Sequence, residues 1–372
     1  MSRAVSRYNY AAQFGPALPA VMADVEQMLV DGRYILTAEV SAFEQAWGAY
    51  LGVKHVRGVN TGTDALILAL LALGVGPGDE VVTQANTFYA TVAAIRLVGA
   101  TPVLVDADEE TFLIDAARLE EVITPRTRVL MPVHLFGKPT PMGPILALAA
   151  KHGLAVVEDA AQAHGAKIAG KCVGAIGTVG CFSFHPSKNL AAAGDGGAVV
   201  TNDDRLAEAL QQRRELGQCG QNHHVVLGLN SKLDAIQARI LHYKLASLEA
   251  WNAQRRRLAE AYRERLADLP VSFQQVHAGE EHVFHLFQVR TDRRDDLLCA
   301  LQAAGVDAIV RYPTPIHLQP AFADQGWRRG QFPIAERLAD ELLCLPMRPD
   351  LGSDAIDYVA DRVRAFFHRD GR

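Results

Sequence analysis

Residues 55–105 read HVRGVNTGTDALILALLALGVGPGDEVVTQANTFYATVAAIRLVGATPVLV and alternate short β-type runs with helical stretches. The β-type runs are 55–59, 80–84 and 101–106, and the helical stretches between them are 63–73 and 88–98. The alternation continues with helical stretches at 115–122 and 141–152 and β-type runs at 128–134 and 154–159. Strands that alternate with helices typically form a mainly parallel sheet with helices packed on it. We therefore predict an α/β fold.

A long amphipathic helix, either continuous or kinked or split, is expected after this sheet. Neither Gly nor Pro occurs between Gly228 and Pro270, and apolar residues recur there every three or four positions. A helix of this length suits a connector between domains, so we predict a large domain at 1–248 and a smaller α/β domain at 249–372. We interpret the run Arg255-Arg256-Arg257 as a solvated face of this helix. In the smaller domain we expect strands at HLFQVR and AIVRY and helices near 293–304, 334–342 and 353–368.

The composition argues against several classes of protein. The chain has 372 residues, of which 49% are hydrophobic and 21% charged, as in globular proteins. A formal net charge of -5 argues against nucleic-acid binding, which needs a basic excess. We see no signal-peptide pattern and no apolar run of roughly 18 residues, so we expect no membrane span and a cytoplasmic location. The five cysteines are scattered without a C-x-x-C pair, which predicts free, mostly buried thiols and no metal site.

Polar residues follow several of the predicted strands. They are Asn60-Thr61-Gly62-Thr63, Asn86-Thr87-Phe88, His134 and Glu158-Asp159. Ligands of open α/β sheets bind beyond the carboxyl ends of the strands, where the following loops meet. These four clusters are therefore expected to converge on one site.

Lys188 lies in SFHPSKNL, after a strand-like run that ends at Phe184 and before the glycine-rich GDGG of residues 194–197. A lone lysine on a turn is usually solvated, so its neighbours decide its interpretation. A lysine that forms a Schiff base must be partly buried, because burial lowers its pKa. A pyridoxal-phosphate (PLP) cofactor also needs a carboxylate at its pyridine nitrogen, and Asp159 is placed to supply one. A strand-terminating acidic turn is the alternative for Asp159.

Two further features fit the same cofactor. Gly62 and Thr63 open a helix directly after a strand, and a helix N-terminus favours a phosphate dianion. An ordinary helix cap without a ligand explains these two residues equally well. Phe88 could lie against the pyridine ring by offset stacking, or could belong to the core.

The sequence resembles the DegT/DnrJ/EryC1/StrS sugar aminotransferases over about residues 8–367. The motifs that carry the resemblance are NTGTDALILAL, ANTFYATVAAI, VEDAAQAHGA, FSFHPSKNLAAAGDGGAVVTND, GLNSKLDAIQA and YPTPIHLQPAF. The resemblance implies the PLP-dependent transferase fold of type I, with a mainly parallel seven-stranded-type sheet. It also implies that Lys188 carries PLP and that Asp159 holds the pyridine nitrogen. The other roles that it implies are Phe88 stacked on the ring, Gln162 near the ring's phenolic oxygen, and Gly62, Thr63 and Ser183 at the phosphate.

Further expectations concern the partners. Asn230 in GLNSKLDAIQA matches a family position that reaches the cofactor phosphate of the neighbouring subunit, which implies a homodimer with shared active sites. The resemblance further implies amino transfer from L-glutamate to a nucleotide-linked keto-sugar, and the PSKNL and GDGG motifs favour carbon 3 of a deoxyhexose. We expect loops around residues 185, 220–230 and 311–320 to orient the sugar. Three histidines are candidate substrate contacts, with a structural role as the alternative for each: His164, His185 and His317.

Two other functions stay open at this point. One is amino transfer to a cyclitol ketone or another keto substrate, because a fold does not fix a substrate. The other is a non-catalytic PLP-binding regulator, because binding motifs can outlive activity. The presence of Lys188 favours an enzyme.

Overall fold

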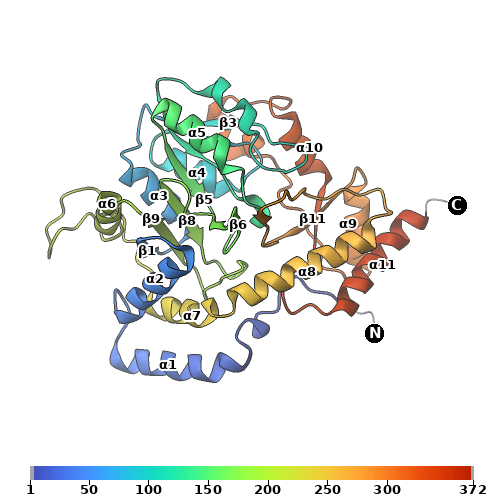
Figure 1. The fold of residues 1–372 in the computed structure, drawn as a ribbon, viewed down its shortest axis with the longest axis horizontal. Coiled ribbons are helices and arrows are strands. Elements are labelled where there is room, and N and C mark those ends of the chain that lie inside the picture. The colour runs from blue at the N-terminus through green and yellow to red at the C-terminus, as the bar shows by residue number, and fades with distance from the viewer. Residues whose placement is uncertain (1–3, 370–372) are drawn as a thin grey trace.

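A computed structural model describes residues 4–369 and shows a large sheet wrapped by helices, joined through a long helix to a smaller lobe (Figure 1). The large sheet has seven strands in the order β1-β9-β8-β5-β4-β2-β3. Neighbouring strands are parallel except around β9, which is antiparallel to β8 and to β1. The predicted mainly parallel seven-stranded sheet is confirmed. The strands are β1 (His55–Val59), β2 (Glu80–Gln84), β3 (Thr101–Val105), β4 (Thr127–Met131), β5 (Ala155–Asp159), β8 (Val179–Ser183) and β9 (Gly197–Thr201).

Helices cover both faces of this sheet, because successive strand residues point to opposite sides. Val82, Val156 and Val200 share cores with α2, α5 and α7, whereas Val81, Val157 and Val199 share a core with α3, α4 and α6. These helices and the N-terminal α1 have the bounds α1 (Leu18–Asp31), α2 (Ala38–Leu51), α3 (Gly62–Ala72), α4 (Tyr89–Leu97), α5 (Met142–His152), α6 (Asp204–Arg214) and α7 (Ala235–Leu245).

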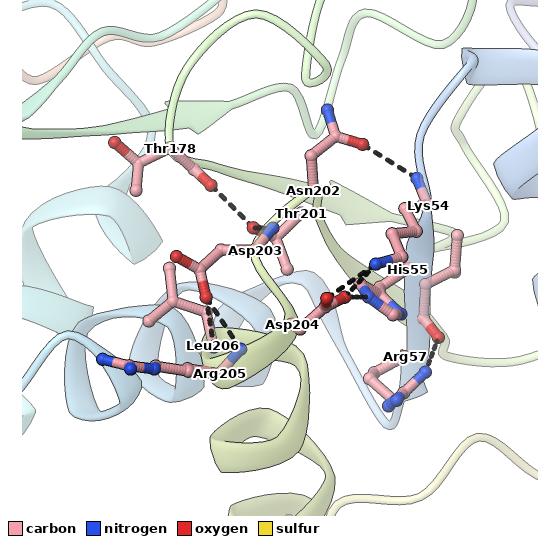
Figure 2. Close-up of polar contacts among 11 residues, drawn as sticks. Lys54, His55, Arg57, Thr178, Thr201, Asn202, Asp203, Asp204, Arg205 and Leu206 are labelled. Atoms are coloured by element: carbon pink, nitrogen blue, oxygen red, sulfur yellow. Dashed lines mark hydrogen bonds and ion pairs between the residues drawn. The ribbon is translucent and has the colours of Figure 1, made fainter.

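Polar contacts fix the β1 edge of the sheet to α6 (Figure 2). Asp203 caps α6 by accepting from the backbone N–H of Arg205 at 2.8 Å and of Leu206 at 3.0 Å. The next residue, Asp204, accepts from Lys54 Nζ at 2.7 Å, and its other oxygen lies 2.5 Å from His55 Nε2. The outer strand is thus held to the helix that follows β9.

The smaller lobe has its own apolar core and a two-stranded sheet. Val5, near the N-terminus, packs into this core and forms an isolated bridge with Val306. The long predicted helix is split, since α7 ends at Leu245 and α8 begins at Leu248. This break lies beside the predicted domain boundary, which stays a prediction. The elements of the lobe are α8 (Leu248–Leu266), β11 (Phe287–Arg290), α9 (Arg294–Ala303), α10 (Pro333–Glu341), β12 (Leu342–Leu345) and α11 (Ser353–Arg369).

Short elements complete the description. A three-stranded sheet joins β10 (Glu280–Glu281), β6 (Lys167–Ile168) and β7 (Lys171–Cys172). The 3₁₀ turns are η1 (Ala11–Gln13), η2 (Gly15–Ala17), η3 (Ala116–Arg118), η4 (Glu120–Val122), η5 (Leu135–Gly137), η6 (Ile316–Leu318) and η7 (Pro320–Gln325). No helix within residues 4–369 is long and apolar enough to cross a membrane. All five cysteines are free; Cys219 and Cys299 are exposed, and the other three are buried.

Three local predictions were wrong. The stretch 115–122 forms the two turns η3 and η4, because Pro125 leaves little room for a helix. AIVRY makes only the single bridge Ile309–Cys344, and the partner of β11 is β12. Arg255 is only 7% exposed and donates from Nη1 to the carbonyls of Phe284 and Met347, so the basic run is not wholly solvated.

Candidate active site

A cavity of about 500 Å³ lies at the carboxyl ends of β1, β2, β5 and β8. It is lined by residues of the loops that follow these strands and by His285, Arg311 and Tyr312 of the smaller lobe. The predicted convergence at the strand ends is therefore largely correct. Eight of the predicted site residues line this cavity: Gly62, Thr63, Phe88, Asp159, Gln162, Ser183, His185 and Lys188.

The N-terminus of α3 forms one end of the cavity. Thr61 caps this helix, since its hydroxyl accepts from the N–H of Asp64 at 2.9 Å and its carbonyl accepts from Ala65 at 3.0 Å. Gly62 and Thr63 lie in the first turn, where no earlier helical carbonyl is available to their N–H groups. A Cβ on Gly62 would lie 2.5 Å from the Cβ of Ser183, so only glycine permits this close approach. The result is a pair of amides beside the Ser183 hydroxyl, suited to an anion.

Asp159 is a buried carboxylate that faces the cavity. Oδ2 accepts from the Thr91 hydroxyl at 2.8 Å, and Oδ1 accepts from the backbone N–H of Ala161 at 3.2 Å. Thr91 uses its proton on Asp159, so it accepts from Thr87, whose hydroxyl lies 2.8 Å away. Burial raises the pKa of Asp159, and no cation within residues 4–369 lies in ion-pair contact with it. A cationic ligand would complete this site.

Glu158, the preceding residue, points to the other side of β5. Its carboxylate accepts from His134 Nε2 at 2.9 Å and from the backbone N–H groups of Gly174, Ile176 and Gly177 at 2.6 to 2.8 Å. His134 Nδ1 accepts from the N–H of Thr140 at 2.9 Å, so Nε2 carries the proton that Glu158 accepts. Glu158 and His134 therefore form a closed structural pair outside the cavity, and His134 does not converge on the site.

Lys188 lines the cavity together with the first turn of α3 and with Arg311 of the smaller lobe. Burial lowers the pKa of its ammonium to about 8; the charge of Asp159 opposes this shift, and that of Arg311 adds to it. A substantial fraction of the side chain is thus a neutral amine near pH 8, as a nucleophile requires.

Gln162 and two aromatic residues line the cavity beside Lys188. The Gln162 carbonyl accepts from the N–H of Phe136 at 2.6 Å, and its amide donates to the Tyr312 hydroxyl at 2.9 Å. The rings of Phe88 and Tyr312 lie 5.3 Å apart between centroids, and the Phe88 side chain is half exposed. Phe88 thus presents an accessible ring at the cavity.

Residues 19–364 match the model of the DegT/DnrJ/EryC1/StrS aminotransferase family. The chain belongs to this family. The predicted resemblance is confirmed, and the protein is a PLP-dependent aminotransferase.

Relatives of this aminotransferase have several names. A pleiotropic regulatory protein of Geobacillus stearothermophilus is 44% identical over 98% of both chains. The dTDP-3-amino-3,4,6-trideoxy-alpha-D-glucose transaminase of Streptomyces venezuelae is 46% identical over 93% of this chain and 92% of the relative. The UDP-N-acetyl-3-dehydro-alpha-D-glucosamine 3-aminotransferase of Acidithiobacillus ferrooxidans is 45% identical over 98% of both. The crystal structure of S. venezuelae DesV in complex with a ketimine intermediate has a TM-score of 0.96 and 43% identity, covering 98% of this chain and 99% of DesV.

The cavity of this family member fits PLP. The uncompensated carboxylate of Asp159 suits a protonated pyridine nitrogen, and the α3 amides with Ser183 suit a phosphate. The amine of Lys188, whose pKa is lowered, suits the aldehyde carbon. The three groups lie in one cavity, and within residues 4–369 no group of His, Cys, Asp and Glu suited to a metal is found.

Three predicted site residues do not line the cavity. His164 is buried among Trp47, Phe182 and Phe184, its Nε2 lies 2.8 Å from the Ser183 carbonyl, and burial lowers its pKa to about 3. His317 is buried in the smaller lobe, 2.9 Å from Glu336. Asn230 is exposed and accepts through its backbone carbonyl from Asn60 at 3.0 Å.

Sequence reasoning missed five residues that complete the site: Tyr8, Thr91, His285, Arg311 and Tyr312. Thr91 was detectable, because it lies in the first turn of α4, four residues after the predicted strand-end residue Thr87. Arg311 and Tyr312 belong to a loop that was predicted to orient the sugar, but no motif singled them out. His285 reaches the cavity from the smaller lobe, and burial holds its pKa well below the usual range. Neither Tyr8 nor His285 carries a local signal.

Proposed function

We propose that the protein transfers the amino group of L-glutamate to carbon 3 of a keto-sugar linked to a nucleotide, in amino-sugar biosynthesis. The observation that carries the proposal is one cavity in which Lys188 faces the uncompensated carboxylate of Asp159. The names of the S. venezuelae and A. ferrooxidans relatives support a 3-amino or 3-keto sugar on dTDP or UDP. A cavity of about 500 Å³ lies within the usual range of small-molecule sites.

In this proposal each cofactor contact has a physical reason. When bound, PLP supplies an electron sink that stabilises negative charge on the carbon from which a proton leaves. Asp159, held by Thr91 and the Ala161 amide, accepts from the pyridine N–H. Gly62, Thr63 and Ser183 bind the phosphate, Phe88 packs against the ring, and Gln162 lies near the phenolic oxygen.

Lys188 is the proposed base of both half-reactions. Its neutral amine would accept a proton from the α-carbon of glutamate, and the ammonium so formed would deliver that proton to the former aldehyde carbon of the cofactor. In the second half-reaction Lys188 returns a proton to the sugar carbon that receives the amino group. A pKa near 8 suits both directions, because neither the amine nor the ammonium is strongly disfavoured.

His185 and the smaller lobe are proposed to contact the sugar. His185 lines the cavity within the Lys188 turn, and its Nδ1 lies 3.0 Å from the Ser187 hydroxyl. Burial and the charge of Lys188 lower the pKa of His185, which favours a neutral ring suited to sugar hydroxyls. His164 and His317 act, in this proposal, through the packing that supports the cavity.

A homodimer with shared sites is part of the proposal. Asn230 does not line the cavity of its own chain. It is the last residue of the segment 215–230, which follows α6. This segment projects from the large sheet at the left of Figure 1. Leu227 in this segment is 91% exposed, and Leu216, Val225 and Val226 are also exposed. Exposed apolar side chains of this kind commonly mark an interface. A cytoplasmic location of the enzyme is also part of the proposal.

The test is a panel of 3-keto and 4-keto sugars linked to dTDP or UDP, each incubated with the holoenzyme and glutamate. Formation of a 3-amino sugar nucleotide, followed by mass spectrometry and NMR, is expected. Amination of carbon 4, or of a cyclitol ketone in preference to every sugar nucleotide, would reject the proposed substrate.

A regulator is the second candidate, because a relative that is 44% identical is named a pleiotropic regulatory protein. A regulator that binds PLP without catalysis predicts that glutamate leaves the visible spectrum of the holoprotein unchanged. An enzyme predicts that glutamate removes the visible band within seconds to minutes. The retained Lys188 and its lowered pKa favour the enzyme.

A further inference from the structure

We propose that Nε2 of His285 accepts a hydrogen bond from Lys188 whenever the lysine is not bonded to the cofactor, and so positions its amine for proton transfer. The inference rests on the proposed role of Lys188 as the base of both half-reactions. It gives a function to a buried histidine of the smaller lobe that lines the same cavities as Lys188.

Lys188 and His285 are shared by two cavities. Besides the cavity of about 500 Å³, a second one of about 140 Å³ is lined by the N-terminal segment, the Lys188 turn and the smaller lobe. Five residues line both cavities: Tyr8, Ser187, Lys188, His285 and Leu286. Among the charges that act on His285, that of Lys188 has the largest effect, which indicates that the two side chains are close.

The contacts of Asn189 fix the proton of His285 on Nδ1. The amide nitrogen of Asn189 donates to the Val283 carbonyl at 2.9 Å and to the Asn252 side-chain oxygen at 3.0 Å. A backbone carbonyl can only accept, so the nitrogen and oxygen of this amide cannot be exchanged, and its oxygen faces His285. Nδ1 of His285 lies 3.3 Å from that oxygen and therefore carries the proton that it donates. In the neutral ring Nε2 is then an acceptor.

This Nε2 is an unused acceptor that is open to the cavities. Burial, together with the charges of Lys188 and Arg255, holds the pKa of His285 well below its usual range, so the ring is neutral. In the described part of the chain Nε2 makes no hydrogen bond. The unpartnered Nδ1 atoms of His164 and His317 are inaccessible to solvent, whereas Nε2 of His285 is accessible. The amine of Lys188 is likewise accessible and, among the described residues, has no hydrogen-bond partner.

A neutral acceptor suits a lysine that must act as a base. An ammonium in a buried site has lost much of its hydration and needs acceptors for its N–H groups. A carboxylate in the place of His285 would hold Lys188 as an ammonium and raise its pKa, whereas a neutral imidazole adds no charge. Asp159 is engaged by the pyridine nitrogen in the proposed function, and Arg311 is a cation that cannot accept.

Two substitutions separate the two ring nitrogens. In His285→Asn the amide occupies the Nδ1 position and can donate to Asn189, but no acceptor occupies the Nε2 position. In His285→Gln the amide occupies the Nε2 position, where its oxygen can accept from Lys188. We expect the glutamate half-reaction at saturating glutamate to slow roughly 10- to 100-fold in His285→Asn, and by less than about fivefold in His285→Gln. The half-saturating glutamate concentration should stay within about threefold of wild type in both variants.

A second measurement uses the apoprotein. PLP is added at a series of pH values, and the rate at which the visible band appears reports the fraction of Lys188 that is neutral. An acceptor at Nε2 stabilises the ammonium, so His285→Asn should move the midpoint to lower pH by about 0.5, and His285→Gln should move it less. The charges of Asp159 and Arg311, which also act on Lys188, are the same in both variants. A histidine that only supported the fold of the lobe would leave this midpoint unchanged.

His282→Gln is the matched control. His282 is buried three residues before His285 and lines neither cavity. Its Nδ1 accepts from the N–H of Phe284 at 2.9 Å, and its Nε2 lies 3.0 Å from the Gln274 side-chain oxygen. This substitution should lower the free energy of unfolding without changing the rate of the half-reaction.

Three results overturn the inference. They are a wild-type rate in His285→Asn, equal losses in the two variants, and a raised half-saturating concentration of glutamate or sugar nucleotide at an unchanged rate. The third result would make His285 a substrate contact. If His285→Asn does not hold PLP, His285→Gln carries the test, and a loss of more than about fivefold overturns the inference.

Failure of the proposed function gives a different pattern. If Lys188→Ala converts glutamate at the wild-type rate, the proposed role of Lys188 fails. If Lys188→Ala is inactive and His285→Asn keeps the wild-type rate, only the inference about His285 fails.

Discussion

Glu158 and Asp159 are adjacent buried carboxylates on β5, and their surroundings differ completely. Glu158 accepts four hydrogen bonds, from His134 and three backbone amides, and lies outside the cavity. Asp159 accepts two and faces the cavity without a cation in contact. A buried acid whose acceptor sites are all used stabilises the fold, whereas one with sites left open is available to a ligand.

The largest effect should come from replacing Lys188, whose amine shares the cavity with the carboxylate of Asp159. Lys188→Ala removes the only amine in the cavity formed by the described residues, so we expect turnover to fall by at least about 1000-fold. Stopped-flow absorption with glutamate measures the first half-reaction. Turnover within tenfold of wild type would contradict the assignment of Lys188 as the base.

Asp159→Asn tests the carboxylate that faces the cavity. The amide cannot balance a protonated pyridine nitrogen, so the glutamate half-reaction should slow by about 100-fold. The free energy of unfolding of the apoprotein should change little, because the amide oxygen can still accept from Ala161 and the Thr91 hydroxyl can rotate to accept from the amide nitrogen. A variant that loses stability and keeps its activity would contradict the assignment of Asp159 to ligand binding.

Glu158→Gln tests the carboxylate whose acceptor sites are filled by His134 and three backbone amides. The amide nitrogen would face a donor that Glu158 now satisfies, so we expect a loss of about 2 kcal/mol in the free energy of unfolding. Urea unfolding of the apoprotein measures this loss, with Asp159→Asn as the matched variant. At low temperature the half-reaction should stay within about threefold of wild type, because Glu158 has no contact with the cavity.

The smallest expected effect is on the pH profile. In the apoprotein the neutral amine of Lys188 is the form that reacts with the PLP aldehyde, so the rate at which the visible band appears on adding PLP should rise about tenfold between pH 7 and pH 9, with a midpoint near 8. The charge of Asp159 raises the pKa of Lys188, so Asp159→Asn should move the midpoint to lower pH. Glu158→Gln should leave the midpoint unchanged. If the midpoint moves in both Asp159→Asn and Glu158→Gln, the claim that only Asp159 acts on Lys188 is contradicted.

The two acids also mark the limit of what the sequence predicts. The strand-end rule located both, and the motifs selected Asp159, Lys188 and Gly62 because local backbone geometry determines where these residues lie. The rule did not distinguish Glu158 from Asp159, because the side of the strand that each faces depends on the packing of the whole sheet. For the same reason His134 was expected at the site and instead binds Glu158.

Residues from the smaller lobe were beyond local reasoning. His285 and Arg311 reach the cavity only because α8 leads the chain away from the sheet and the lobe then folds back against it. Arg255 was misjudged because a run of charges indicates solvent exposure on average, whereas buried carbonyls of two distant segments accept from this side chain. Tertiary contacts of this kind leave no periodic signal in the sequence.

The central claim is that Lys188 carries the cofactor, and chemical trapping tests it most directly. The holoenzyme is reduced with sodium borohydride and digested, and the modified peptide is identified by mass spectrometry. The account predicts a pyridoxyl-phosphate adduct on the peptide that contains Lys188, and loss of the adduct when glutamate is added before reduction. An adduct on another lysine, or none on a holoenzyme that aminates its substrate, would contradict it.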